Sequence, residues 1–213
     1  VVLAGLGQLD SGILSFQEAI RLAPSYSAAH VAMGNAQVEQ GRFEGAITSY
    51  RHALEINPGD IESMVNLGNA LSELGRTEEA ITTFRQAIDR DPRFMGAYHN
   101  LGHTLLDLGR IVEAIDVYRI ALRTAPDHPV VLADLGVALA LQNNHDEATA
   151  CYLRVLEINP EDAETHYNLG NTLRATGKPE KAIESYRAAI RLRPADADAH
   201  VNLGLVYLSL GNF

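Results

Sequence analysis

The chain has 213 residues, a formal net charge of −10 and only two lysines, Lys178 and Lys181. Nucleic-acid binding requires clustered positive charge, so this composition argues against a nucleic-acid partner. The single cysteine, Cys151, permits no internal disulfide, and no apolar run approaches the length of about 20 residues that spans a bilayer. We therefore predict a cytoplasmic protein without a membrane partner.

Proline recurs at a constant interval of 34 residues and divides the chain into repeats. The prolines are Pro24, Pro58, Pro92, Pro126, Pro160 and Pro194. In chain order we expect a partial unit at 1–26 that is mainly a second helix, full units at 27–60, 61–94, 95–128, 129–162 and 163–196, and a first helix at 197–213. Because proline cannot continue a helix, each unit ends there, and the units are predicted to stack as an array.

Each full unit is predicted to contain two helices. Apolar residues at helical spacing form one stripe per helix, and small residues at repeat positions 8, 20 and 27 let the two helices approach closely. Between the helices lies a residue that tolerates the left-handed conformation. These residues are Gly7, Gly41, Gly75, Gly109, Asn143, Gly177 and Gly211. Repeat position 4 carries three histidines that we expect to pack between helices: His30, His166 and His200.

This pattern resembles the tetratricopeptide repeat (TPR) family, and the resemblance covers the whole chain. It implies an all-α fold, a right-handed TPR superhelix (α-solenoid) of antiparallel helix pairs. In that fold the first helices line a concave groove. The resemblance further implies a protein or peptide partner, no cofactor and no catalytic activity in these residues. The unit at 129–162 diverges most, with Asn143, Thr149 and Val155 at otherwise regular positions.

Asparagine recurs at two predicted groove positions, 6 and 9 of the repeat. The residues are Asn35, Asn66, Asn69, Asn100, Asn168, Asn171 and Asn202. A side-chain amide both donates and accepts, so these residues can pair with the backbone of an extended peptide. The pattern is similar to the asparagine ladder in the TPR arm of O-linked N-acetylglucosamine transferases. It is also common in TPR grooves generally, so both interpretations stay open.

Charge narrows the predicted partner to a neutral or basic segment. Acidic groove residues outnumber the single arginine, Arg174. They are Glu39, Glu62, Glu73, Asp107, Asp134, Glu164 and Asp198. Repeat positions 2, 5 and 6 hold no lysine or arginine. TPR proteins that clamp acidic chaperone tails carry basic residues there, so we expect no such clamp.

Two histidines provide the one candidate for metal chemistry. His99 and His103 stand four residues apart on a predicted first helix, and Asp134 occupies a groove position in the next unit. Together they could bind a divalent metal, but two histidines at helical spacing occur often by chance, so we favour ordinary groove polarity and predict no metal. Cys151 has no base within its own helix, so we interpret it as a structural thiol.

Three functional hypotheses follow. The preferred one is a non-catalytic protein–protein interaction scaffold that binds an extended peptide or partner segment in its groove. The alternative is the substrate-recognition arm of a larger enzyme, such as a glycosyltransferase similar to O-linked N-acetylglucosamine transferases, and sequence beyond Phe213 would distinguish the two. The third is an element that self-associates end to end. The predicted last helix, 198–210, is too apolar for a capping helix, so we expect a further repeat or another copy to cover it.

Overall fold

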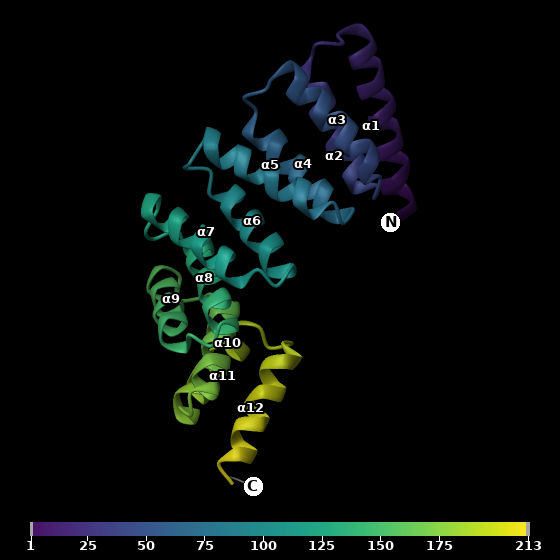
Figure 1. The fold of residues 1–213 in the computed structure, drawn as a ribbon. Coiled ribbons are helices and arrows are strands. Elements are labelled where there is room, and N and C mark those ends of the chain that lie inside the picture. The colour runs from purple at the N-terminus through teal and green to yellow at the C-terminus, as the bar shows by residue number, and fades with distance from the viewer. Residues whose placement is uncertain (1, 212–213) are drawn as a thin grey trace. The chain divides into compact units, whose positions relative to one another are not determined.

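The computed structural model describes residues 2–211, with side chains from Leu9 onward. Across these residues the chain forms twelve α-helices joined by short turns and no strand, as predicted. The helices divide into two compact units, of which the first ends at Thr104 and the second begins at Leu105. Within each unit consecutive helices lie side by side and run in opposite directions (Figure 1).

The first unit contains the helices that line the site described below. They are α1 (Val2–Leu22), α2 (Ser27–Glu39), α3 (Phe43–Ile56), α4 (Ile61–Glu73), α5 (Thr77–Arg90) and most of α6 (Met95–Asp107). Two first helices of this unit pack on the second helices of their own repeats, α2 on α3 and α4 on α5. In addition, α2 contacts α4, the first helix of the next repeat.

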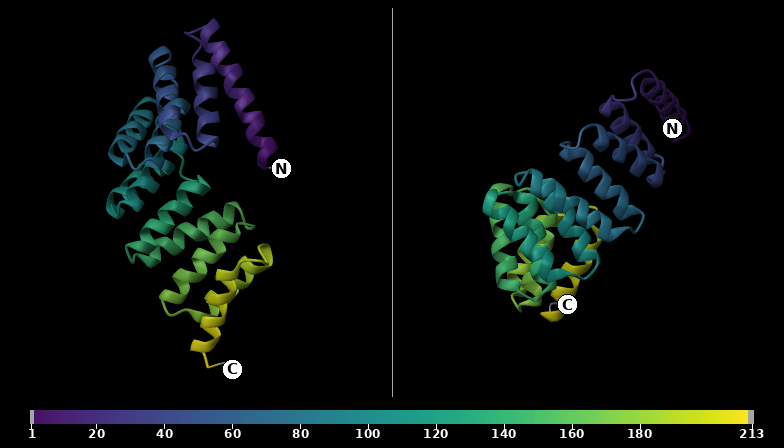
Figure 2. Two further views of the ribbon diagram at one scale, coloured as in Figure 1. Left: turned by 90° about the vertical axis from the view of Figure 1, so that its right-hand side faces the viewer. Right: turned by 45° about the horizontal axis from the view of Figure 1, so that its top comes forward.

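The second unit repeats this arrangement. Its helices are α7 (Ile111–Thr124), α8 (Pro129–Leu141), α9 (His145–Ile158), α10 (Ala163–Ala175), α11 (Pro179–Leu192) and α12 (Ala197–Ser209). Figure 2 shows these helices from two further directions. Here α10 contacts both neighbouring first helices, α8 and α12. Neighbouring first helices are therefore in contact within each unit, α2 with α4 in the first and α10 with α8 and α12 in the second.

The turn between paired helices uses the left-handed conformation, as the sequence predicts. Gly41 has φ of 70°, and Asn143 reaches 64° in the divergent repeat. After the Gly41 turn, the amide of Arg42 donates to the carbonyl of Gln37 at 2.8 Å, which satisfies one of the last helical carbonyls. Asparagine tolerates this backbone conformation better than most residues, which explains why it replaces glycine at position 143.

The core is built around the contact between repeat positions 8 and 24. An added Cβ on Gly34 would lie 2.5 Å from the Tyr50 ring, and one on Gly170 would lie 2.7 Å from the Tyr186 ring. Glycine at position 8 thus lets an aromatic side chain pack directly against the first-helix backbone. The small residues at position 20 (46, 80, 114, 148 and 182) and position 27 (53, 87, 121, 155 and 189) are fully buried beside it.

The position-4 histidines form hydrogen bonds to the turn that precedes their helix. The Nε2 atoms of His30, His166 and His200 lie 2.9 to 3.0 Å from the carbonyl oxygens of the prolines six residues earlier. Because a carbonyl only accepts, Nε2–H is the donor in each case. The sequence predicts packing for these residues, and their hydrogen bonds give them a specific role in fixing the turn.

The predicted break at Gly7 is wrong. The helix α1 runs from Val2 to Leu22 without interruption, and Gly7 is not among the residues with positive φ. Glycine permits the left-handed conformation but does not impose it. The preceding sequence contains Leu3, Ala4 and Leu6, which favour a continuing helix.

Candidate functional site

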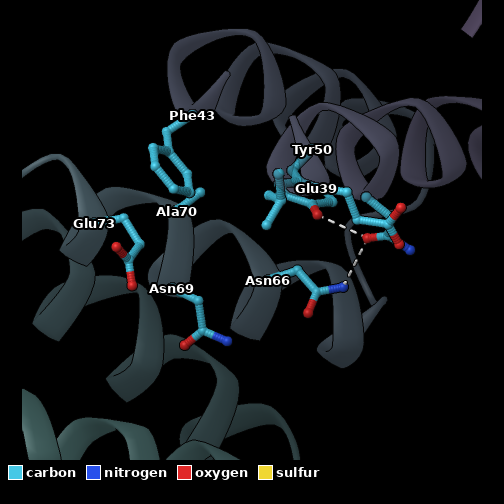
Figure 3. Close-up of a pocket in the computed structure, with 9 residues that line it drawn as sticks. Glu39, Phe43, Tyr50, Asn66, Asn69, Ala70 and Glu73 are labelled. Atoms are coloured by element: carbon cyan, nitrogen blue, oxygen red, sulfur yellow. Dashed lines mark hydrogen bonds between the residues drawn. The ribbon is translucent and has the colours of Figure 1, made fainter. Parts of the chain in front are cut away.

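The asparagines of the first unit are connected through a buried tyrosine. The Tyr50 hydroxyl donates to Asn35 Oδ1 at 2.7 Å, and Asn66 Nδ2 approaches the same oxygen at 3.5 Å (Figure 3). Tyr50 is only 2% exposed, and this burial raises the pKa of its phenol to about 12. Asn35 itself is exposed. The tyrosine hydroxyl therefore orients the Asn35 side chain through Oδ1, and Nδ2 has no hydrogen-bond partner among the described residues.

A cavity of about 550 Å³ adjoins this network between α2 and α4. Its apolar wall comes from Val38, Phe43 and Ala70. Figure 3 shows the Phe43 ring directed toward Ala70. The cavity has the size of a small-ligand pocket, and it combines an apolar wall with a few polar groups, which is the usual composition of binding sites.

Polar groups form the rest of the cavity. Asn66, Asn69, Glu39 and Glu73 line it, and no basic residue does. Glu39 and Glu73 hold the same position in consecutive repeats and, in the view of Figure 3, lie on opposite sides of the cavity. Within the described part of the chain, the side chains of Asn69, Glu39 and Glu73 have no hydrogen-bonding or ionic partner. All three are exposed and available to a ligand.

Two more cavities meet the first at Asn35. One, of about 610 Å³, lies toward α1 and is lined by Leu9, Phe16 and Glu39 among others. The other, of about 460 Å³, lies toward the N-terminal ends of α2 and α4 and includes Val31 and Asp60. Asn35 lines all three cavities. The three cavities therefore border the exposed face of α2 and share Asn35, and we call them together the groove around α2.

The second unit contains the same asparagine–tyrosine network. The Tyr186 hydroxyl donates to Asn171 Oδ1 at 2.8 Å, and Asn202 Nδ2 donates to that oxygen at 3.2 Å and to the Tyr167 hydroxyl at 2.9 Å. Burial raises the pKa of Tyr186, whereas the hydrogen bond and charge of Arg174 lower it. Arg174 occupies the repeat position that Val38 holds in the first unit.

Two other tyrosines of the second unit, Tyr118 and Tyr152, lack this network. The Tyr118 hydroxyl is buried and has no hydrogen-bond partner among the described residues. Burial raises the pKa of this phenol, and the carboxylates of Asp134 and Asp107 raise it further. At Tyr152 the residue corresponding to Asn35 is Val137, which offers no hydrogen bond.

The family model for the cilia and flagella-associated protein 70 C-terminal domain, a TPR domain, matches residues 3–205. The chain belongs to this family. A comparison with curated proteins found no match.

Solved TPR structures share the fold of this TPR domain. YrrB, described as a TPR protein with an unusual peptide-binding site, is 22% identical, with a TM-score of 0.65 over 93% of this chain and 98% of its own. A TPR protein from Parabacteroides merdae is 20% identical, with a TM-score of 0.76 over 98% of this chain and 83% of its own. TTC0263 from Thermus thermophilus is 24% identical, with a TM-score of 0.66 over 85% of this chain and 99% of its own.

The remaining predicted groove asparagines are Asn100 in the first unit and Asn168 in the second. Both are partly exposed, and neither side chain has a hydrogen-bond partner within the described residues. They differ from Asn35 and Asn171, whose Oδ1 atoms are engaged by tyrosine. The sequence contained a signal for this difference, because a tyrosine follows Asn35 and Asn171 by fifteen residues, whereas an isoleucine follows Asn100 and Asn168 at the same interval. Phe84, which has no hydroxyl, follows Asn69 at that interval.

The sequence also named three candidate metal ligands, His99, His103 and Asp134, and interpreted Cys151 as a structural thiol. The rings of His99 and His103 lie 4.7 Å apart between centroids in the first unit, and Asp134 belongs to the second unit, so the absence of a metal site stays a prediction. Burial, and secondarily the Glu147 carboxylate, raises the pKa of Cys151 to about 11. A thiol with so high a pKa is a poor nucleophile at neutral pH.

No described helix of this TPR domain has the length and apolarity needed to cross a membrane.

Proposed function

We propose that this TPR domain is a non-catalytic protein-interaction scaffold that binds an extended peptide or partner segment along its first helices. The observation that carries the proposal is the groove around α2, where three cavities meet at Asn35. TPR domains typically mediate protein interactions, and the structurally similar YrrB is described as having a peptide-binding site.

Three first-unit asparagines supply the backbone contacts in this proposal. Asn66, Asn69 and Asn100 lie on consecutive first helices, with Asn69 and Asn100 free of internal hydrogen bonds among the described residues. An extended peptide rises about 3.3 Å per residue, and packed helices are spaced about 8–10 Å apart, so every third peptide residue meets a new helix. In the second unit Asn168 offers an equivalent amide that is free among the described residues, whereas Asn171 and Asn202 are bonded to each other and to tyrosines.

The test uses a matched pair of double variants. A display library of random 12-residue peptides is selected on the wild-type protein, and the affinities of the selected peptides are measured by calorimetry. N69A/N100A removes two free amides from first helices, whereas Q17A/Q86A removes two exposed amides from the second helices α1 and α5. We expect N69A/N100A to weaken binding by about 1–3 kcal/mol, the sum of two neutral hydrogen bonds, with Q17A/Q86A unchanged.

Two results would count against the proposal. If the library yields no binder, the domain does not recognise extended peptides. If N69A/N100A binds the selected peptides as tightly as wild type, recognition lies on another surface. Helical circular dichroism of both variants should match wild type, because none of the substituted amides is buried.

The asparagine pattern also supports the alternative function. If the domain is the substrate-recognition arm of a larger glycosyltransferase, the same groove would hold the substrate polypeptide, and a nucleotide-sugar transferase domain would be found in the full-length protein. The full-length reading frame tests this alternative directly. The peptide-binding experiment does not distinguish the two functions, because both use the groove.

A further inference from the structure

The cavity between α2 and α4 combines features suited to one kind of side chain. Its two carboxylates, Glu39 and Glu73, are exposed and lack partners among the described residues. They project from adjacent first helices at equivalent positions, and no lysine or arginine lines the cavity. A positive group placed between them would interact favourably with both.

The apolar wall provides a second and independent feature. The Phe43 ring is half-buried and borders the cavity together with Val38 and Ala70. Such a wall suits the aliphatic stem of a long basic side chain, and an aromatic face also attracts a guanidinium group. The volume of about 550 Å³ exceeds that of one side chain, which leaves room for adjoining peptide backbone at Asn66 and Asn69.

We propose that this cavity is a specificity pocket for a basic side chain of the bound peptide, with arginine preferred over lysine. The planar guanidinium can stack on Phe43 while its five N–H donors reach Glu39 and Glu73, whereas an ammonium offers a compact charge without a stacking surface. This inference rests on the proposed groove function and adds the residue type that the groove selects.

The two first helices that carry the second network, α10 and α12, do not repeat this pocket. In the second unit the positions of Val38, Glu39 and Phe43 are held by Arg174, Ala175 and Pro179. The positions of Asn69 and Glu73 are held there by Leu205 and Ser209. The equivalent place in the second unit therefore has no carboxylate and gains a cation, so the basic side chain is placed in the first unit only.

The test uses synthetic peptide pools of 12 residues with capped ends. The central residue is fixed as arginine, lysine, citrulline, norleucine or glutamate, and all other positions are randomised among Gly, Ala, Ser and Thr. Citrulline is the decisive comparison, because it keeps the shape of arginine and removes the charge. Binding is measured to wild type, to E39Q/E73Q and to the control E161Q/E184Q, which neutralises two exposed carboxylates in the second unit.

We expect wild type to bind the arginine pool about tenfold more tightly than the citrulline pool, with lysine intermediate and glutamate weakest. In E39Q/E73Q the ratio of arginine to citrulline affinity should fall to about one, while E161Q/E184Q keeps the wild-type ratio. The preference should also narrow as salt is raised, because both carboxylates are exposed.

Each contrary outcome has a defined meaning. Equal binding of the arginine and citrulline pools, together with weakened binding to N69A/N100A, would overturn the basic pocket and leave the groove function standing. An arginine preference retained in E39Q/E73Q would place the recognition elsewhere and likewise overturn the pocket. Failure of every pool to bind wild type would overturn both proposals.

Discussion

The two units contain the same hydrogen-bonded network in opposite electrostatic surroundings. Tyr50 and Tyr186 each donate to an asparagine of their own repeat, and a second asparagine from the next repeat approaches the same oxygen. Around Asn35 stand Glu39 and Glu73, whereas Arg174 stands beside Tyr186. The network recurs in these two repeats, and the residues that flank it differ between them. In the function proposed above, the network supports the fold and the flanking residues determine what each unit recognises.

The largest expected effect concerns the glycines that the two units share. G34A and G170A each push a Cβ into a buried tyrosine ring, so each should lower the free energy of unfolding by about 1–3 kcal/mol. Gly204 occupies the same repeat position but a Cβ there meets nothing within 4 Å. G204A should therefore be neutral or stabilise by about 0.5–1 kcal/mol, because alanine is the better helix former.

Thermal and urea unfolding of the three glycine variants measure these changes. Equal effects of G34A and G170A would support a shared structural core. A G204A variant as unstable as the other two would contradict the ring-contact explanation, since no ring lies near that residue.

The next effect separates structural from free asparagines. N35A and N171A each leave a buried tyrosine hydroxyl without its acceptor, so each should cost about 1–3 kcal/mol of stability. N69A removes an exposed amide whose neighbouring aromatic residue, Phe84, has no hydroxyl, and it should stay within about 0.5 kcal/mol of wild type. Urea unfolding with an unchanged m-value makes the comparison, and a large loss in N69A would show that free amides also support the fold.

A smaller effect should appear at alkaline pH. Burial raises the pKa of Tyr50 from its usual value of 10 to about 12, so the folded state holds its proton more tightly than the unfolded state. This contribution to stability is complete below pH 10 and is lost as the pH rises toward 12. In Y50F the melting temperature should decline less between pH 10 and pH 12 than in wild type. If the two proteins decline equally, ionisation of Tyr50 does not cause the loss of stability.

The helices of this domain could be predicted from sequence because their determinants are local and repeated. Every 34 residues the same glycine, small residues and proline recur, and the structure places paired helices between them. Gly7 is the exception, since one residue that permits a turn does not determine it. At the other turns, a residue that tolerates the left-handed conformation recurs at the same place in every full repeat, and this repetition supported the prediction. Gly7 lies in 1–26, which was predicted as a partial unit, so the prediction there depended on one residue.

The site was predicted only in part, because its organisation depends on contacts between helices. The sequence identified Asn35, Asn66 and Asn69 as groove residues, but it did not reveal that Tyr50 occupies the Asn35 oxygen. It also predicted the acidic balance without indicating that Glu39 and Glu73 border one cavity with Phe43. Both facts require the packing of α2 against α3 and α4, which periodicity alone does not determine.

The most direct test of the central claim is an NMR titration of the ¹⁵N-labelled protein with the tightest-binding arginine-centred peptide. Side-chain amide resonances report on each asparagine separately. The account predicts that the resonances of Asn69 and Asn100 shift on binding while those of Gln17 and Gln86, on the second helices, stay in place. Shifts confined to the second helices, with the groove asparagines unmoved, would contradict it.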